Sequence, residues 1–574
     1  MMAHSLSRLQ HGGRLPALVL GLFLAYLVLL PLALVLYTSF KPTGFPLDPG
    51  FTLQNYLRTY GDPRFWTLAW NTLGFAIGST FFALLIGTII AWLLERTDLP
   101  FRGFVRILVI LPMATPPVLM AIGWAILLSP RNGYLNDMLI GLLGLESAPF
   151  NIYSLGGMIA VEALSLVPST VLILAPAFRN MDPNLEEAAL VAGAGGFLML
   201  RRVVLPLLAP ALLSASVFLL IVCFVVFDVP GTLGMPSGIY VLSSRIYYLA
   251  VDSPTGIPEY GLISAMAVFF LVLLLALAFG YRRMTRQAGR FVVVTGKGWR
   301  ARALKLGRWR WPAFLFVCLY FLLAVVAPLA ILVLMSLMPF QVRLSGLHAE
   351  LFTLKNHIEF FGSAFALRAA WHSVLIAVVA ASAVAVLSLL VSWVVVRSKA
   401  PGRGLIDSLA FLPLAIPGVM IGVALIYVYL MLPWTRVYGT IWIIAIAYVT
   451  LYLSFGSRTT NSVLLQLHAD LEDAARTCGA GWTRTMRWVV GPLMLPALVG
   501  VWVWVVAHCM RELSSALMLQ GNDNKTLPVL LWGYWSGGQP NKAAAVGVWL
   551  ILALLLVVVI WQALARRGQL RRAA

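Results

Sequence analysis

Twelve long apolar segments separated by short polar stretches divide the chain. A helix needs about 20 apolar residues to cross a bilayer, and all twelve segments reach or approach that length. The pattern therefore predicts an all-α polytopic membrane protein. The expected spans are Leu15–Tyr37, Trp66–Leu94, Phe104–Leu128, Tyr153–Ala177, Leu207–Val226, Tyr260–Tyr281, Pro312–Leu337, Trp371–Val396, Leu405–Met431, Gly439–Phe455, Leu493–His508 and Ala543–Leu564.

The composition agrees with this class. Of 574 residues, 61% are hydrophobic and only 11% are charged, whereas soluble domains carry roughly 25% charged residues. The net charge of +20 would suit a nucleic-acid-binding protein, but the basic residues lie between and after apolar runs. Positive-inside topology explains this distribution better, so we expect membrane lipid and no nucleic acid as the surroundings.

The basic clusters also predict the orientation. With a cytoplasmic N-terminus, the clusters at Arg96–Arg102, residues 282–311, Arg397–Arg403 and Arg566–Arg572 all lie in the cytoplasm. The C-terminus is then cytoplasmic too, in a multi-pass protein of the bacterial inner membrane. The first span lacks a small-residue cleavage site after it, so we expect it to be retained. The four scattered cysteines form no disulfide framework or C-x-x-C metal site.

A polar stretch occurs twice without a gap. Leu185–Pro210 reads LEEAALVAGAGGFLMLRRVVLPLLAP, and Leu471–Pro496 reads LEDAARTCGAGWTRTMRWVVGPLMLP. Each copy begins with an acidic pair, which favours a helix start. Two alanines follow, and then a glycine that lets the backbone end one short helix and turn into a second. We predict a helix-turn-helix at the membrane surface in each copy. The residues are Glu186, Glu187, Ala188, Ala189 and Gly193, and Glu472, Asp473, Ala474, Ala475 and Gly479.

The spacing of these residues resembles a known motif. Glu-Ala-Ala, three residues, Gly, nine residues, an aliphatic residue, one residue and Leu-Pro is similar to the EAA loop of permease subunits of binding-protein-dependent ABC importers. The first copy fits throughout, and the second departs at Asp473 and Gly491. The resemblance implies the type I ABC importer permease (MetI-like) fold, in which the first short helix docks on a cytoplasmic ATPase. The ten hairpin residues are thus expected to couple to the ATPase; a plain surface hairpin is the alternative.

The duplication extends over most of the chain. Trp92, Arg96 and Pro112 match residues 301 positions later, whereas the hairpins are 286 apart. FTLQNY at Phe51 matches FTLKNH at Phe352, and the 15-residue difference maps to the outer loop Ser129–Asn151. We predict two parallel six-helix repeats, 1–281 (EAA loop 185–206) and 312–574 (EAA loop 471–492), joined by the basic cytoplasmic linker 282–311.

No nucleotide-binding motif accompanies the repeat. Gly296-Lys297-Gly298 lacks the hydroxyl residue and the upstream glycine of a P-loop. We therefore expect two copies of a separate ABC ATPase to use ATP and magnesium, while this chain binds no cofactor. The resemblance adds a periplasmic or lipid-anchored solute-binding protein as a further partner.

Ionisable residues inside the spans are candidates for the translocation path, because insertion costs roughly 2.5 to 3.5 kcal/mol for each. Glu162 lies in the fourth span, where it either lines the pore or bonds a neighbouring helix for structure. Asp228 and Glu512 follow the fifth and eleventh spans in FDVPGTLGMP and RELSSALMLQ. They either face the solute or hold a re-entrant turn, with Arg511 as a salt-bridge partner. His508 either ligates or titrates, or is simply hydrogen-bonded.

No nucleophile elbow, H-E-x-x-H or metal-ligand cluster appears, so we predict a transport permease and not an enzyme. The double length and the sequences FDVPGTLG and RELSSALML resemble ferric-iron importers, and carboxylates suit a hard cation. Importers of thiamine, 2-aminoethylphosphonate or polyamines are the alternatives. An ion-coupled secondary transporter is the alternative class, although it would not need duplicated cytoplasmic hairpins.

Overall fold

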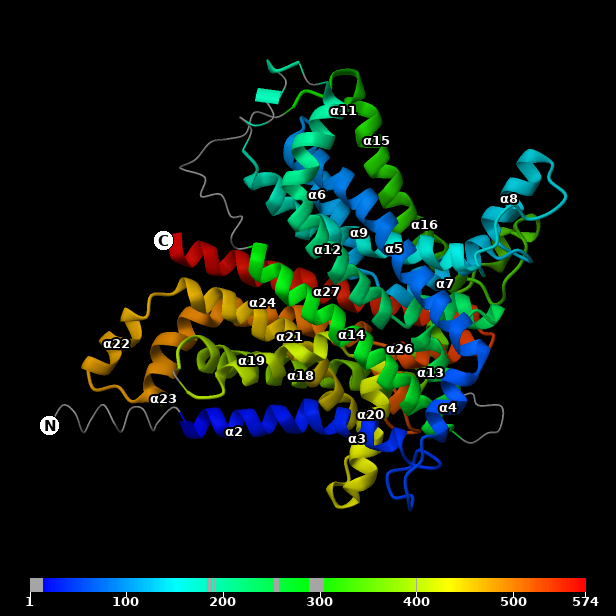
Figure 1. The fold of residues 1–574 in the computed structure, drawn as a ribbon. Helices are drawn as coiled ribbons and strands as arrows, with labels where there is room; N and C mark the ends of the chain where they lie inside the picture. The colour runs from blue at the N-terminus through cyan, green and yellow to red at the C-terminus, as the bar shows by residue number, and fades with distance from the viewer. Residues whose placement is uncertain are drawn as a thin grey trace.

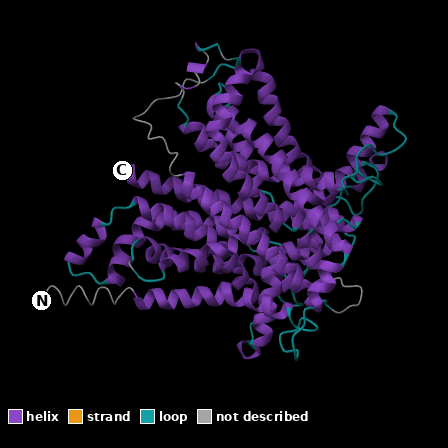
Figure 2. Cartoon of the chain, viewed as in Figure 1, coloured by secondary structure: helices purple, strands orange, loops and turns teal. Residues whose placement is uncertain are grey.

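The computed structural model describes residues 14–182, 185, 188–189, 191–193, 195–251, 258–288, 304–398 and 400–573. Within these ranges the chain is helical and contains no strand (Figure 2). Ten helices are long and apolar enough to cross a membrane, and two bent helix pairs raise the number of possible spans to 12. The predicted class, a polytopic all-α membrane protein, is confirmed.

The two halves repeat the same order of elements. The first half consists of α2 (Arg14–Leu24), η1 (Ala25–Leu29), α3 (Leu30–Ser39), α4 (Gln54–Gly61), α5 (Pro63–Arg96), α6 (Arg102–Ile110), η2 (Leu111–Ala114), α7 (Pro117–Leu128), α8 (Tyr134–Leu143), α9 (Leu155–Asn180), α11 (Gly196–Met199), η3 (Leu200–Val204), α12 (Leu205–Val225), η4 (Pro230–Gly234), α13 (Leu242–Val251) and α14 (Tyr260–Ala288). The second consists of α15 (Arg310–Phe321), η8 (Leu322–Val326), α16 (Ala327–Ser336), α17 (Lys355–Gly362), α18 (Ala364–Val396), α19 (Arg403–Phe411), η11 (Leu412–Ala415), α20 (Gly418–Met431), α21 (Ile441–Gln466), α22 (Asp470–Thr477), α23 (Trp482–Thr485), η13 (Met486–Val490), α24 (Gly491–Arg511), α25 (Ser514–Leu519), α26 (Leu527–Ser536) and α27 (Pro540–Ala573). Only the first half has α8, and this helix fills the longer outer loop that the sequence predicted.

The third and ninth spans are broken, which corrects the prediction of two continuous helices. The pair α6–η2 and α7 is bent by 94°, and the pair α19–η11 and α20 by 115°. The breaks fall at Thr115 and Ile416, which have extended backbones and each precede a proline. Proline disfavours helical geometry in the preceding residue and removes a backbone donor, so neither helix can continue through its break.

The tenth span was predicted too short, as Gly439–Phe455, because its second part is polar. In the structure α21 continues to Gln466. Thr460 Oγ1 donates to the carbonyl of Ser388 on α18 at 3.1 Å and bonds the hydroxyl of Ser392 at 2.5 Å. Because the Thr460 hydroxyl finds its hydrogen-bond partners on the neighbouring helix α18, a polar helix face is stable inside the bundle.

The matched FTLQNY and FTLKNH segments make the same contact in each half. The amide of Asn55 donates to the carbonyl oxygens of Ser39 and Lys41 at 3.0 and 2.7 Å. The amide of Asn356 donates to two carbonyls after α16 at 3.1 and 2.7 Å. Each asparagine therefore closes the turn between the first span of its half and the following short helix.

The first span of each half packs against the other half. Helix α3 contacts α20, and in η1, just before α3, the hydroxyl of Tyr26 is 3.0 Å from that of Tyr429 on α20. Helix α16 contacts α7 so closely that a Cβ atom on Gly123 would lie 2.7 Å from the backbone of Pro328. Because the first span of each half packs on the other half, the two halves form one body.

The helices form two groups, which lie close together at one end of the molecule and diverge at the other (Figure 1). Figure 1 shows α7, α13, α20 and α26 near the meeting point. The hairpin elements α11 and α22–α23 lie at the diverging ends, at the top and at the left of the view, and α27 also ends on that side. The outer helix α8 lies on the opposite side, at the right.

Candidate functional site

The second hairpin forms a short helix, a glycine turn and a second short helix. Helix α22 is followed by Gly479, which has a φ of +81° and so needs a residue without a Cβ atom. Leu471, Asp473 and Ala474 are exposed, and Ala475 is half-buried. The predicted helix-turn-helix is confirmed here, and its exposed face includes Leu471 beside acidic and small residues.

The first hairpin has the same turn. Gly193 has a φ of +80°, and the amide of Ala192 donates to the carbonyl of Ala188 at 2.9 Å in the turn before it. Ala188 is exposed and Ala189 half-buried. Glu186 and Glu187 lie outside the described residues, so their predicted place in the coupling helix stays a prediction.

Glu472 differs from its neighbours because its side chain points inward. Its Oε1 atom lies 2.9 Å from Nε of Arg397, in an ion pair whose side chains are only 6% and 14% exposed. The indole of Trp393 donates to Oε2 at 3.3 Å. Arg397 also donates to the carbonyl oxygens of Leu464 and Leu467 at 3.1 and 2.6 Å. These bonds attach α22 to the ends of α18 and α21.

Part of this attachment recurs in the first half. Arg96 corresponds to Arg397 and is buried, and it donates to the carbonyl of Met181 at 3.2 Å. Met181 lies 286 positions before Leu467, so the two arginines bond equivalent carbonyl groups. The structure thus explains the repeated arginines by their bonds to equivalent carbonyl groups. The sequence alone explained them only by positive-inside topology.

Two of the predicted intramembrane acids have an unpaired buried oxygen. Glu162 on α9 is 2% exposed, and its Oε2 atom has no hydrogen-bond partner. Asp228, between α12 and η4, likewise has no partner for Oδ1. The Oε2 atom of Glu162 therefore gives no support to the alternative in which this carboxylate bonds a neighbouring helix.

Glu512 holds a turn, as one of the alternatives predicted. Its carboxylate accepts hydrogen bonds from the amide and hydroxyl of Ser515 at 3.1 and 2.9 Å, and from the amide of Ala516 at 3.4 Å. These donors belong to the first turn of α25. The same carboxylate lies at the start of α20, since a Cβ atom on Gly418 would be 2.9 Å from Oε1. Glu512 therefore links α25 with the ninth-span break.

His508 is hydrogen-bonded on both ring nitrogens. Nδ1 is 2.8 Å from the carbonyl of Trp504, and Nε2 is 2.7 Å from Nη2 of Arg511. Because a guanidinium only donates, Nε2 accepts and Nδ1 carries the proton, which makes the imidazole neutral. The hydrogen-bonded alternative for His508 is confirmed.

Arg511 was predicted as a salt-bridge partner of the acids, but its bonds run elsewhere. Besides His508, it donates through Nη1 to the carbonyl of Met113 in η2. The described residues contain no group of three or more His, Cys, Asp or Glu side chains placed to hold a metal ion.

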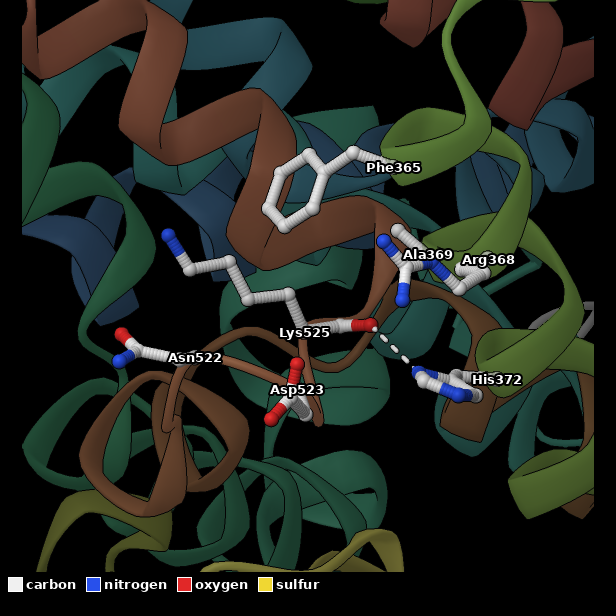
Figure 3. A pocket seen from close by; sticks show the side chains of 7 residues that line it. All are labelled: Phe365, Arg368, Ala369, His372, Asn522, Asp523 and Lys525. Atoms are coloured by element: carbon white, nitrogen blue, oxygen red, sulfur yellow. Dashed lines mark hydrogen bonds between the residues drawn. The ribbon is translucent and has the colours of Figure 1, made fainter.

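Sequence reasoning missed a small pocket that lies near the N-terminal end of α18. It lies between the first turns of α18 and the loop that precedes α26 (Figure 3). His372 Nδ1 is 3.3 Å from the carbonyl of Lys525 across it. The lining residues are Phe365, Arg368, Ala369, His372, Asn522, Asp523 and Lys525.

The repeated hairpins and broken spans agree with a family assignment. Residues 83–289 and 386–569 each match the family described as binding-protein-dependent transport system inner membrane component. The chain belongs to this family, as a fused two-half permease of a type I ABC importer.

Its relatives include permeases of cation importers. The ferric transport system permease protein FbpB of Actinobacillus pleuropneumoniae is 26% identical over 488 residues, or 84% of this chain and 68% of that protein. The spermidine/putrescine transport system permease protein PotB of Haemophilus influenzae is 29% identical over 279 residues, or 47% of this chain and 93% of that protein. A solved bacterial alginate ABC transporter is 23% identical, with a TM-score of 0.36, over 44% of this chain and 87% of that chain.

Proposed function

We propose that this permease imports ferric iron across the bacterial inner membrane in an ATP-driven complex. A periplasmic or lipid-anchored binding protein delivers the solute, and two copies of a cytoplasmic ATPase engage the two hairpins and use ATP and magnesium. The observation that carries the proposal is the ferric permease relative, which matches both halves of the chain. The carboxylates of Glu162, which is buried, and of Asp228 and Glu512, which are half-buried, add hard oxygen groups suited to a hard cation.

The hairpins are proposed to carry the coupling. The exposed face at Ala188, Ala474 and the two turn glycines offers little side-chain bulk, which suits a helix that docks in a groove. When ATP draws the ATPase subunits together, the hairpins move toward one another and the bundles open outward; hydrolysis resets them. Such a cycle requires that the ATPase bind the two states with different affinity. The separation of the hairpin ends in Figure 1 is compatible with the state that this proposal assigns to the reset permease.

Glu472 has a different part in this proposal. Its ion pair with Arg397 holds α22 at a fixed angle to the bundle, so that movement of the hairpin is passed to α18 and α21. Glu472 is thus a positioning residue, while Asp473, Ala474 and Ala475 form the docking face. In the first half, Glu186 would be the positioning residue and Glu187 would belong to the docking face.

The two broken spans are proposed to border the translocation path. They are the elements that Arg511 and Glu512 contact, through Met113 and near Gly418. Irregular backbone inside a membrane is tolerated where it is buried in protein or lines a cavity. Glu162 and Asp228 each keep a buried carboxylate oxygen without a hydrogen-bond partner, which leaves acceptors for a passing cation.

The substrate assignment is tested by reconstituting the permease with the ATPase and binding protein encoded beside it. We expect ATP-dependent uptake of radiolabelled ferric iron into proteoliposomes, and no uptake of thiamine or 2-aminoethylphosphonate. Uptake of one of those solutes without iron would contradict the substrate. Uptake of any solute by the permease alone, driven by an ion gradient, would contradict the ATP-driven mechanism.

A polyamine is the second candidate solute. The spermidine/putrescine permease relative supports it, and polyamines are multivalent cations that buried carboxylates would also attract. Its match covers 47% of this chain, whereas the ferric relative covers 84%. Spermidine belongs in the same uptake assay, and transport of spermidine in place of iron would favour this candidate.

We also infer that both hairpins and both chain ends face the cytoplasm. The basic clusters beside the hairpins support this orientation through the positive-inside rule. Single cysteines at Ala188 and Ala474 should react with an impermeant thiol reagent only after the membrane is opened. Labelling of intact cells at either position would overturn the coupling proposal.

A further inference from the structure

One arginine at the start of the first broken span has an incomplete set of hydrogen bonds. Arg102 is the first residue of α6, and its Nε and Nη2 atoms are buried without a hydrogen-bond partner among the described residues. These two nitrogens form one edge of the planar guanidinium, an edge that can bind two oxygen atoms of a phosphate or carboxylate at once. The matched Arg403 of the second half donates to the carbonyl of Ser398 at 3.1 Å. Arg102 lacks such a bond and keeps an open edge for an oxyanion.

A second arginine lies one helical turn further on the same face of α6. Arg106 donates to Glu95 Oε1 at 3.1 Å, and Arg179 at the end of α9 donates to both oxygens of this carboxylate at 3.2 and 3.3 Å. The side chain of Glu95 is 8% exposed, whereas those of the two arginines are 53% and 62% exposed. One carboxylate thus serves two cations, so this end of the first half keeps an excess of positive charge beside Arg102.

The segment that leads into the second half lies against the turn between α5 and α6. Leu304 pairs with Thr97 in a parallel β-bridge. The amide of Leu306 donates to Asp98 Oδ1 at 2.8 Å. Three basic residues of this segment are exposed, namely Lys305, Arg308 and Arg310. The end of the linker therefore adds its positive charges to those of α6 and α9.

Aromatic side chains place these basic residues at the depth of lipid headgroups. Trp309 and Trp311 are exposed, as is typical of tryptophans at a membrane–water interface. The ring of Phe314 on α15 lies 6.2 Å from that of Trp311 and 5.8 Å from that of Phe101. Phe101 has a left-handed φ of +52° where the matched residue is Gly402. A strained backbone thus presents an exposed aromatic ring directly before α6.

We propose that this basic cluster (Arg102, Arg106, Arg179 and the linker end) binds the phosphodiester headgroup of an anionic phospholipid. The open edge of Arg102 holds two phosphate oxygens, and Arg106 supplies the second cation. Because Arg102 is only half-buried, rotation of its flexible side chain brings this edge to the headgroup. The exposed Phe104 and Ile107 of α6 lie along the acyl chains, which favours a lipid over a soluble anion.

Such a lipid has a structural consequence for the permease. Helix α6 belongs to the first half and α15 begins the second, and the two helices are in contact. A headgroup bound between their ends joins the first broken span to the other half. The inference goes beyond the transported solute. With the proposed orientation, the lipid belongs to the cytoplasmic leaflet.

The test uses the full chain in detergent micelles, and native mass spectrometry counts the lipids bound at each concentration. We expect the wild type to bind dioleoyl phosphatidylglycerol about tenfold more tightly than dioleoyl phosphatidylcholine, because a charge-assisted bidentate pair is a strong interaction. Arg102→Met removes the guanidinium and should lose this preference. Arg102→Lys keeps the charge without the two-pronged edge and should lose most of it. A full preference in the lysine variant would overturn the bidentate assignment.

Matched controls separate this site from general attraction to anionic lipid. Arg403→Met removes a guanidinium at the equivalent position of the second half and should leave the preference unchanged, even if losing the bond to Ser398 lowers the melting temperature in every lipid. Inorganic phosphate and glycerol 3-phosphate test the soluble alternative. Displacement of phosphatidylglycerol by an equal concentration of either one would assign the site to soluble phosphate and overturn the lipid.

A second measurement needs no variant and so does not depend on how well Arg102→Met folds. Phosphatidylglycerol with a photoreactive headgroup should cross-link in the wild type to peptides that contain α6 or residues 304–315. The inference is overturned if the cross-links map only elsewhere, if Arg102→Met keeps the wild-type preference, or if Arg403→Met loses as much. It is also overturned if Arg102→Met binds lipid normally but binds the purified ATPase more weakly, which would assign the open edge to an acidic residue of the ATPase.

These outcomes do not depend on the transported solute or on the orientation, since a micelle has no sides. The proposed function fails in the uptake assay, if no iron enters proteoliposomes. Preferential binding of phosphatidylglycerol at Arg102 without iron uptake would keep the lipid site and reject the iron importer.

Discussion

The ion pair between Glu472 and Arg397 gives the sharpest test of the coupling proposal. The Glu472 side chain is buried, 6% exposed, the Arg397 side chain is nearly so, 14% exposed, and Oε1 and Nε are 2.9 Å apart. Removing one partner of a buried pair costs about 3 to 5 kcal/mol. Arg397 would keep its bonds to two carbonyl oxygens in Glu472→Met, so we expect the lower end, about 3 kcal/mol.

Helix α22 has only eight residues and cannot keep its position without such contacts. If the loss undocks the helix, the ATPase has to restore its position on binding, and its apparent affinity falls by up to about 100-fold. Arg397→Met should have a similar effect, and the double variant should be little worse than either single one, with a coupling energy of about 2 kcal/mol.

The assay is titration of purified ATPase onto the permease in nanodiscs, followed by ATP-dependent uptake. Glu359→Gln is the matched control, because Glu359 pairs with Lys542 at 3.0 Å but the two side chains are 40% and 42% exposed. Surface pairs of this kind contribute about 1 kcal/mol or less. Unchanged ATPase affinity in Glu472→Met, or strictly additive losses in the double variant, would refute the positioning role.

Three further predictions concern single positions. Valine at Gly193 or Gly479 is strained at a φ near +80°, and it should abolish uptake and ATPase co-purification while membrane insertion persists; normal uptake would remove the docking role. Gly123→Ala brings a Cβ atom within 2.7 Å of the α16 backbone and should lower thermal stability by about 1 to 3 kcal/mol, whereas Gly141→Ala, with nothing within 4 Å, should not. Hydrogen bonds from a threonine lower the pKa of Asp48 below 3.8, so this carboxylate stabilises the fold above that pH and the contribution is lost as the pH falls through the lowered pKa. Asp48→Asn should therefore lower the melting temperature at neutral pH, and the difference from the wild type should shrink as the pH falls through the lowered pKa; a difference that does not change with pH would contradict it.

The number of spans and the repeat could be read from the sequence because both depend on local pattern. Apolar length marks a span whatever surrounds it, and a match at fixed spacing marks the hairpins and the Asn55 and Asn356 turns. The two broken spans were missed although their signal was present. Thr115 and Ile416 each precede a proline inside an apolar run, but apolar length alone does not distinguish a kinked helix from a sharp re-entrant bend.

Side-chain partners that come from distant parts of the chain could not be predicted. Glu472 looks like its acidic neighbour in sequence, and only the packing of α22 on α18 turns it inward. The carbonyl of Met113 becomes available because η2 ends at the break, so no sequence pattern pairs it with Arg511. Periodicity gives the element in which a residue lies, whereas tertiary packing decides which groups meet.

Arg511 also gives a physical reason for joining two permease halves in one chain. The positions 286 residues before His508 and Arg511 are Val222 and Val225, so the hydrogen-bonded histidine and arginine exist in one half only. In a permease made of two identical subunits, a guanidinium that reaches across to the other half would occur twice at the same interface. The two charges would repel each other in a medium of low dielectric constant, where opposing acids could not easily compensate both. Fusion allows each half to carry a different residue at matched positions, so that a single arginine bonds the carbonyl of Met113 while Glu512 beside it lies at the other break. Restoring the symmetry tests this argument: Val225→Arg should lower the yield of folded permease far more than the same change at Leu57, which is 72% exposed outside the spans, and equal yields would show that the interface accepts two arginines.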